Sequence, residues 1–266
     1  YARSLNNLGT LKYASGDWDG AQADYGRAVE VHERIGEVEG LALACTNLGV
    51  LYTDRGEWAK AEEHLHRAFT IAQHIAHPSQ LALVHMSLGR LYLLQARWTD
   101  CARHLDAAIS LYAGAGDYAM QNLSDAYELQ GRLHLEQGQP DAALQWAERC
   151  YALLQGVTGA NEGESVERGR YERLMGRIAQ AHGDLDAARR HMEHSTAIFH
   201  ATGSQIETGR TAYWNGLLSL ESDQPEKARE ELLAAQQVFK RLGSAADLQR
   251  VEQQLARVEA STGPSL

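Results

Sequence analysis

Apolar side chains recur along this chain every three or four residues, in stretches that glycine and polar residues separate. Residues 38–55 and 58–75 each carry such a stripe, the first of them made by Leu41, Cys45, Leu48 and Tyr52. This spacing matches the α-helix, and no strand-type alternation of any length occurs. The pattern predicts pairs of antiparallel helices. It also predicts a final amphipathic helix in 244–260, with Leu248, Val251, Leu255 and Val258 on one face.

Small residues repeat at fixed offsets in six segments of the chain. Their anchors are spaced by 40 to 45 residues and are Gly9, Gly49, Gly89, Gly131, Gly176 and Gly216. Further small residues follow most anchors after 7, 12 and 19 positions, as Gly16, Ala21 and Ala28 do in the first copy. A small side chain lets a neighbouring helix approach closely, and glycine suits the left-handed turn that ends a helix. We therefore expect six repeats, each a pair of helices.

The Leu-Gly in the first helices of repeats 1 to 3 and the paired alanines of the second helices resemble the tetratricopeptide repeat (TPR), in a long variant of about 40 residues. Repeats 4 to 6 depart from this pattern, with Gln130 and Asn215 before the glycine in two of them. The segment AVEVHERIGEVEGLALACTNLGVLY (28–52) is similar to that variant in two settings. One is the sensor region of bacterial STAND-class signalling ATPases of the maltose-regulon activator type. The other is the spindle-orientation and kinesin light chain adaptors.

The resemblance implies an all-α, right-handed superhelical TPR solenoid over residues 1–266, with six helix pairs plus a C-terminal capping helix. The expected repeats are 1–36, 37–76, 77–116, 117–156, 162–203 and 204–243, with the cap in 244–260. A terminal helix with one polar face is what closes the open end of a stacked array.

The 266 residues include 35 acidic and 25 basic side chains, a formal net charge of −10. Such a surface disfavours nucleic acid and anionic membranes as partners. No apolar run reaches the roughly 18 residues of a membrane span, and no secretory leader opens the chain, so we expect a cytoplasmic protein. Only four basic residues are lysines, a bias typical of a GC-rich bacterial genome. Because Tyr1 already lies inside a helical pattern, we expect a piece of a longer protein.

The resemblance implies that the first helix of each pair lines a concave groove, where arginines form a stripe. Arg90, Arg132 and Arg177 each follow their anchor by one residue, and Arg170, Arg173 and Arg177 share one helix face. Arg210 takes the groove register of Arg170, six residues before the anchor. Like charges at this spacing repel and need an anion or solvent, which favours a carboxylate-bearing peptide, a phosphate or a sugar phosphate as ligand. The alternative is neutralisation by Glu128, Asp125, Glu136 and Glu221 of the same chain.

Two amides and two aromatic residues complete the expected groove site. Asn7 and Asn47 share a register two residues before their anchors, and the resemblance implies that such amides bind the backbone of an extended peptide. The alternative is a hydrogen bond to the adjacent helix. Tyr213 and Trp214 would add apolar contacts, although an aromatic at helical spacing is also typical of the core.

The motifs of catalysis are missing from the sequence. There is no glycine-rich phosphate loop after a strand, no Gly-x-Ser-x-Gly elbow and no His-Glu-x-x-His, so we expect neither an enzyme nor a bound metal or cofactor. The three cysteines are odd in number and far apart, which excludes a disulfide framework.

The repeats and the missing catalytic motifs predict a binding module, and the resemblance implies the ligand- or protein-sensing domain of a bacterial STAND-type signal-transduction ATPase or transcription regulator. Its partner would be a protein or peptide, an acidic one being favoured, or a small anionic ligand in the groove. The neighbouring domains of the parent chain would be further partners, with no nucleic acid and no membrane. The alternatives are a passive adaptor for protein–protein interaction and a regulatory subunit of an enzyme encoded elsewhere.

Overall fold

The computed structural model describes residues 1–114, 120–156 and 165–262. These residues form thirteen α-helices and no strand, as the apolar pattern predicts. The helices are α1 Ala2–Ser15, α2 Trp18–Ile35, α3 Val38–Arg55, α4 Trp58–His74, α5 Pro78–Leu94, α6 Trp98–Ala113, α7 Met120–Glu136, α8 Pro140–Gly156, α9 Val166–Ala181, α10 Leu185–Thr202, α11 Gln205–Glu221, α12 Pro225–Leu242 and α13 Ala245–Thr262. None of these helices is long and apolar enough to cross a membrane.

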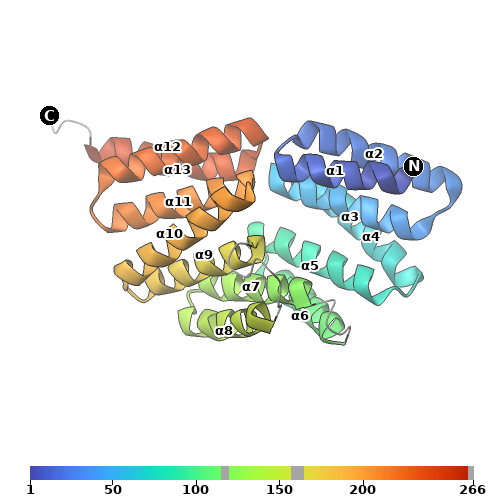
Figure 1. Ribbon diagram of the computed structural model, residues 1–266, viewed down its shortest axis with the longest axis horizontal. Coiled ribbons are helices and arrows are strands. Elements are labelled where there is room, and N and C mark those ends of the chain that lie inside the picture. The colour runs from blue at the N-terminus through green and yellow to red at the C-terminus, as the bar shows by residue number, and fades with distance from the viewer. Residues whose placement is uncertain (115–119, 157–164, 263–266) are drawn as a thin grey trace. The chain divides into compact units, whose positions relative to one another are not determined.

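The chain divides into two units, Tyr1–Thr158 with α1 to α8 and Gly159–Leu266 with α9 to α13. In each unit consecutive helices pair, α1 with α2, α3 with α4 and so on, and each pair packs against the next (Figure 1). In the second unit α13 packs on α12. The helix-pair architecture of a TPR solenoid is thereby confirmed, and the single solenoid over 1–266 stays a prediction.

The turns between paired helices follow the repeat. The residue seven positions after each anchor has a positive φ in all six copies: Gly16, Gly56, Ala96, Gly138, Gly183 and Asp223. This left-handed conformation ends the first helix and costs glycine little. Acidic residues then cap the next helix, since Asp17 accepts from the backbone N–H of Gly20 and Asp184 from that of Ala187, both at 2.9 Å.

The anchor glycines lie where two paired helices approach most closely. A Cβ on Gly49 would lie 2.5 Å from Leu65 Cγ, and one on Gly89 would lie 2.6 Å from Leu105 Cδ2. No side chain larger than hydrogen fits at these distances unless the partner helix moves. The small residues twelve positions after the anchors are fully buried in all six copies: Ala21, Ala61, Cys101, Ala143, Ala188 and Ala228. The role predicted for the repeated small residues is confirmed.

The predicted apolar stripe of the last helix is also confirmed. Val251, Leu255 and Val258 of α13 are buried in one cluster with Leu232 and Phe239 of α12, and Leu248 packs against that cluster. The outer face of α13 is polar, and its exposed side chains include Arg250, Glu252, Gln253 and Arg257. This helix covers the apolar side of α12 and turns its polar face outward.

Candidate functional site

A pocket opens between the first helices of the first unit. It has a volume of about 260 Å³. Its walls are Arg3, Asn6 and Asn7 of α1, Glu39, Gly40 and Leu43 of α3, Gln80 of α5, and His32 at the end of α2. Asn7 belongs to the groove site expected from the sequence. Arg3 and Leu43 share the register of Arg170 and Arg210, six residues before an anchor, and Asn6 shares that of Arg173, three residues before one. The other four were missed.

Three of the polar residues that line the pocket, Asn6, Asn7 and Gln80, are carboxamides. Asn47 Nδ2 donates to Asn6 Oδ1 at 3.0 Å, so Asn47 makes the bond to the adjacent helix, while Asn7 is exposed in the pocket wall. Gln80 Nε2 donates to the carbonyl of Glu39 at 3.1 Å. Gln80 Oε1 is buried and has no hydrogen-bond partner among the described residues. An unsatisfied buried acceptor is costly, which makes it a place where a ligand donor would be favoured.

His32 is the second under-satisfied group of the pocket. Its side chain is 2% exposed and its Nδ1 lies 2.7 Å from Glu37 Oε2. This contact lacks the alignment of a hydrogen bond, and Nε2 has no hydrogen-bond partner within the described residues. The ring packs against Gly40, where an added Cβ would lie 2.2 Å from His32 Cε1. The glycine is therefore needed for the imidazole to reach the pocket.

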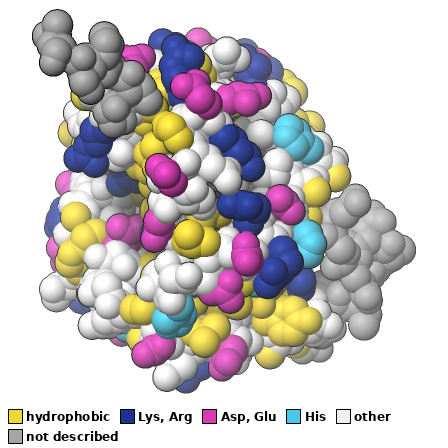
Figure 2. Space-filling model, turned by 90° about the vertical axis from the view of Figure 1, so that its left-hand side faces the viewer, with side chains coloured by type: hydrophobic (Ala, Val, Ile, Leu, Met, Phe, Trp, Pro, Cys, Tyr) yellow, Lys and Arg dark blue, Asp and Glu magenta, His cyan; other side chains and the backbone are white. Residues whose placement is uncertain are grey.

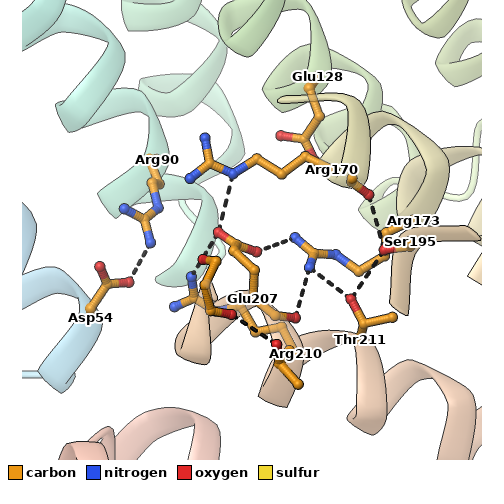
Figure 3. A network of polar contacts seen from close by, with 12 residues as sticks. Asp54, Arg90, Glu128, Arg170, Arg173, Ser195, Glu207, Arg210 and Thr211 are labelled. Carbon is orange, nitrogen blue, oxygen red and sulfur yellow. Dashed lines mark hydrogen bonds and ion pairs between the residues drawn. The ribbon is translucent and has the colours of Figure 1, made fainter. Parts of the chain in front are cut away.

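Arg90 of α5 forms an ion pair with a neighbouring first helix. It pairs with Asp54 of α3 (Figure 3), and the Asp54 carboxylate also accepts a hydrogen bond from the Tyr13 hydroxyl of α1. The Asp54 side chain is fully buried, so one carboxylate ties together three consecutive first helices. Arg132 lies on the same helix as Glu128, with Nη1 3.9 Å from Glu128 Oε2, as the neutralisation alternative predicts.

The arginines of the second unit surround a buried carboxylate. Glu207 of α11 accepts from Arg170 Nε at 3.1 Å and from Arg173 Nη2 at 2.5 Å, both on α9 (Figure 3). Arg210 Nη2 lies 3.1 Å from Asp247 Oδ2 of α13 and its Nη1 lies 3.7 Å from Glu207 Oε1. The side chains of Arg173 and Glu207 are 5% and 4% exposed. Three of the expected groove arginines thus converge on carboxylates of their own chain.

Arg177 and the two aromatic residues are brought together. The guanidinium carbon of Arg177 lies 3.8 Å from the centroid of the Trp214 ring, a cation–π contact between α9 and α11. Tyr213 and Trp214 meet edge to face at 5.4 Å, and both are partly buried. These three residues therefore form one contact between neighbouring first helices, and their role in ligand binding stays a prediction.

Two residues that the sequence analysis did not place in the groove, Gln80 and Glu207, share one register of the repeat. Gln80 and Glu207 both stand nine residues before their anchors, in the first turns of α5 and α11, and both reach back to the preceding first helix. The same register holds Gly40 in the pocket wall. This register could have been included in the groove from the repeat spacing alone.

Glu221 is one of the acids that the sequence offers for neutralising the arginines. It accepts a hydrogen bond from Gln180 Nε2 at 2.6 Å.

His85 and His104 pack against each other in the first unit. His85 Nδ1 lies 2.9 Å from His104 Nδ1, and Phe69 lies edge-on to both rings. Within the described parts of the chain, no three His, Cys, Asp or Glu side chains are grouped so that they could hold a metal ion. Burial lowers the pKa of His104 to about 4, and repulsion from His85, then Arg103 and His66, adds to this effect, which Asp100 opposes.

We expect the first unit to lose stability in mild acid. The unfolded chain protonates His104 near pH 6.5, whereas the folded chain does so only near its lowered pKa of about 4. The free energy of unfolding should therefore fall by about 1–3 kcal/mol as the pH drops between these values. Urea denaturation at pH 7.5 and 4.5 measures this loss. His104→Gln should flatten the decline and the exposed-site control His194→Gln should not; equal slopes in both variants would contradict the assignment.

The fold and these contacts define a class of protein, the helical-repeat solenoids whose helix pairs stack through small residues. Residues 1–74 and 125–149 match models of the tetratricopeptide repeat, so these two segments carry tetratricopeptide repeats. A search of curated proteins found no match to the sequence.

Solved structures share the fold at low sequence identity. The apo form of RapI is 11% identical, with a TM-score of 0.71 over 91% of this chain and 84% of that chain. A Rap protein complexed with competence and sporulation factor is 12% identical, with a TM-score of 0.68 over 97% and 74%. NprR in complex with its cognate peptide NprX is 14% identical, with a TM-score of 0.65 over 94% and 73%. At this identity the likeness establishes the fold alone.

Proposed function

We propose that this chain is a binding module that recognises an extended peptide, or an extended segment of a protein, on the face formed by its first helices. The pocket between α1, α3 and α5 is the observation that carries the proposal. It combines exposed Asn7 with Gln80 Oε1, a buried acceptor that lacks a donor among the described residues. A peptide group offers one donor and one acceptor, which is what a carboxamide needs. Two solved structures of the same fold contain a bound peptide or factor, which supports this choice.

The charge of the partner follows from which cations are accessible. Arg170, Arg173 and Arg210 are engaged by Glu207 and Asp247, so an acidic ligand there would have to compete with buried carboxylates. At the pocket, the Arg3 side chain is 78% exposed and its Nη2 lies 4.0 Å from Glu37. An acidic residue or a small anion would therefore meet Arg3 first. Figure 2 shows acidic and basic side chains interspersed over the face that it draws, which supports a protein partner over nucleic acid.

The experiment uses peptides selected by the protein itself. A random dodecapeptide display library is panned on the chain, and the dissociation constants of the enriched peptides are measured by calorimetry. The double variant Asn7→Ala, Gln80→Ala should weaken binding by about tenfold or more, because two hydrogen bonds are lost. Lys60→Ala, an exposed change on the second helix α4, serves as the matched control and should bind normally. Equal affinities for the double variant and the wild type would remove the pocket from the proposal.

Within this function we propose a sensor role in a STAND-type regulator of a bacterial cytoplasm, with no catalysis by the chain itself. Residues 28–52 resemble the long repeat variant of such sensor regions, and they resemble equally the variant of the spindle-orientation and kinesin light chain adaptors. Buried cysteines at 45, 101 and 150 suit a reducing compartment. A passive adaptor is the alternative. X-ray scattering of the chain with and without an enriched peptide separates the two, because a sensor should change its dimensions on binding and an adaptor should keep them.

A further inference from the structure

Two arginines of the second unit bind the same kind of partner at the same spacing. Arg170 Nε donates to Glu207 Oε1 at 3.1 Å, and Arg210 Nε donates to Asp247 Oδ2 at 3.1 Å, each across 37 residues. In both cases the acid stands in the first turn of a later helix, α11 or α13. This combination of a cation with an oxygen acceptor 37 residues further on is called the 37-residue pair below.

The first unit keeps this spacing with different residues. The position 37 residues before Gln80 is Leu43, and the position 37 residues before Gly40 is Arg3. Gln80 and Gly40 again stand in first turns, those of α5 and α3. One pair therefore has the acceptor opposite a leucine, and the other has the cation opposite a glycine. All four residues line the pocket between α1, α3 and α5, so this pocket is where the 37-residue pair is incomplete.

Gln80 presents the acceptor that lacks a cation. Its Nε2 donates to the carbonyl of Glu39 at 3.1 Å. Because a carbonyl oxygen only accepts, the amide nitrogen must face Glu39 and Oε1 must face away from it. Oε1 is buried and has no hydrogen-bond partner among the described residues, and Leu43 carries no donor that could reach it. In the second unit an arginine N–H binds the acceptor at the equivalent position.

The groups around Gln80 also favour a cation. His32 Nδ1 lies 2.7 Å from Glu37 Oε2, so a proton is favoured on Nδ1 and Nε2 is left as a second acceptor in the pocket. The backbone N–H of Gly40 already donates to Glu37 Oε2 at 2.9 Å. Two acids, Glu37 and Glu39, stand at this end of α3 against the single guanidinium of Arg3. The charge and the acceptors therefore agree.

We propose that the pocket binds a cationic nitrogen group of the ligand, with Gln80 Oε1 as its acceptor, as Glu207 binds Arg170. This inference rests on the peptide-binding function proposed above, in which the group is the amino terminus or the side chain of a lysine or an arginine. An ammonium donates three hydrogen bonds and a guanidinium five, whereas a backbone amide donates one, so a cation can satisfy both Gln80 and His32. The pocket volume of about 260 Å³ is several times the roughly 30 Å³ of one water, which leaves room for such a group. Arg3 remains at the rim for an acidic residue of the same peptide.

The ligand side of this contact is tested with peptides. Dodecapeptides enriched by panning are synthesised with an acetylated amino terminus, with norleucine for each lysine, or with citrulline for each arginine. One of these changes should weaken binding by about tenfold or more, because a hydrogen bond to a charged group is lost, and it identifies the source of the cation. In Gln80→Ala the same change should cost less, since its acceptor is gone. If peptides bind at the pocket and none of the three changes weakens them, the cation is excluded while the peptide function stands.

A small cation tests the pocket without any peptide. The hydrochloride of n-butylamine is titrated into the isotope-labelled chain at constant ionic strength, and the side-chain amide signal of Gln80, identified by its absence in Gln80→Ala, is followed by NMR. The signal should shift and saturate in the millimolar range, as a few hydrogen bonds to a charged group allow. Butyramide, which is neutral and of similar length, should leave the signal in place. No shift with n-butylamine, or an equal shift with butyramide, would overturn the proposal whatever the panning yields.

Leu43→Arg supplies the cation that the 37-residue pair lacks. Its guanidinium should bind Gln80 Oε1 and lower the affinity for n-butylamine by about fivefold or more, because the acceptor is then occupied. Leu43→Met is the matched control, since it keeps an apolar side chain of similar size, and it should bind within about twofold of the wild type. Thermal denaturation verifies that both variants are folded. A folded Leu43→Arg variant with unchanged affinity for n-butylamine contradicts the proposal.

Discussion

Replacing Glu207 by alanine is expected to lower the free energy of unfolding of the second unit by about 3–5 kcal/mol. The carboxylate is 4% exposed and bonds Arg170 and Arg173, while Arg210 Nη1 lies 3.7 Å away. Its removal leaves the guanidinium of Arg173, 5% exposed, buried without its charged partner. Thr211 Oγ1 at 3.1 Å would remain, but a hydroxyl cannot neutralise a cation. The lost charge compensation, rather than the lost volume, sets the size of the effect.

Amide hydrogen exchange in α9 to α11 measures this effect, because it reports the opening of the second unit separately from that of the first. Glu207→Gln keeps the shape and removes the charge, so it should lose an intermediate amount. Glu230→Ala removes an exposed acid of the same unit and should change the free energy by no more than about 0.5 kcal/mol. If Glu207→Ala costs no more than Glu230→Ala, the arginines do not depend on this carboxylate.

The repeat made the helices and their packing predictable. An anchor such as Gly49 is repeated because every helix pair needs one place of closest approach, and that need is local to the pair. The turn residues follow the same logic. Even Ala96 and Asp223, which depart from glycine, adopt the left-handed conformation that their place in the repeat requires.

The partners of the arginines were not predictable in the same way. Arg90 meets Asp54 across 36 residues, and Arg173 meets Glu207 across 34 residues. Each pair joins neighbouring first helices. In the third repeat, the position equivalent to Asp54 is Leu94 and the position equivalent to Glu207 is Gln80. The acids are therefore not repeated, and the repeat pattern does not identify them. The repulsion expected between the arginines does require a nearby anion. In the second unit that anion is Glu207 of α11, the next first helix, and it is not a separate ligand.

The pocket residues were missed for a related reason. The groove registers were taken from the middle of the first helices, whereas Gln80 and Glu39 stand in their first turns. His32 comes from the end of a second helix, which the groove model assigned to the outside. Its access depends on Gly40, a glycine at a register that other repeats fill with larger residues such as Gln80 and Glu207.

Asp54→Ala should lower the free energy of unfolding of the first unit by about 2–4 kcal/mol. The substitution removes the shared partner of Arg90 and Tyr13, which come from α5 and α1. Arg90 is 17% exposed, so water can reach it in part, and the loss should be smaller than at Glu207. Tyr13→Phe deletes one hydrogen bond and should cost about 1 kcal/mol.

The double variant Asp54→Ala, Arg90→Met distinguishes a charge effect from a packing effect. If the cost arises from the guanidinium of Arg90 losing the charge of Asp54, the second change should recover part of the stability lost in Asp54→Ala, since a buried ion pair is often replaceable by apolar groups. Urea denaturation of the four proteins of this cycle gives the coupling energy between the two side chains. A coupling energy near zero would show that Arg90 is solvated independently of Asp54.

Because Asp54 also holds α1, α3 and α5 together, Asp54→Ala should weaken the binding of peptides selected at the pocket, while Tyr13→Phe should do so less.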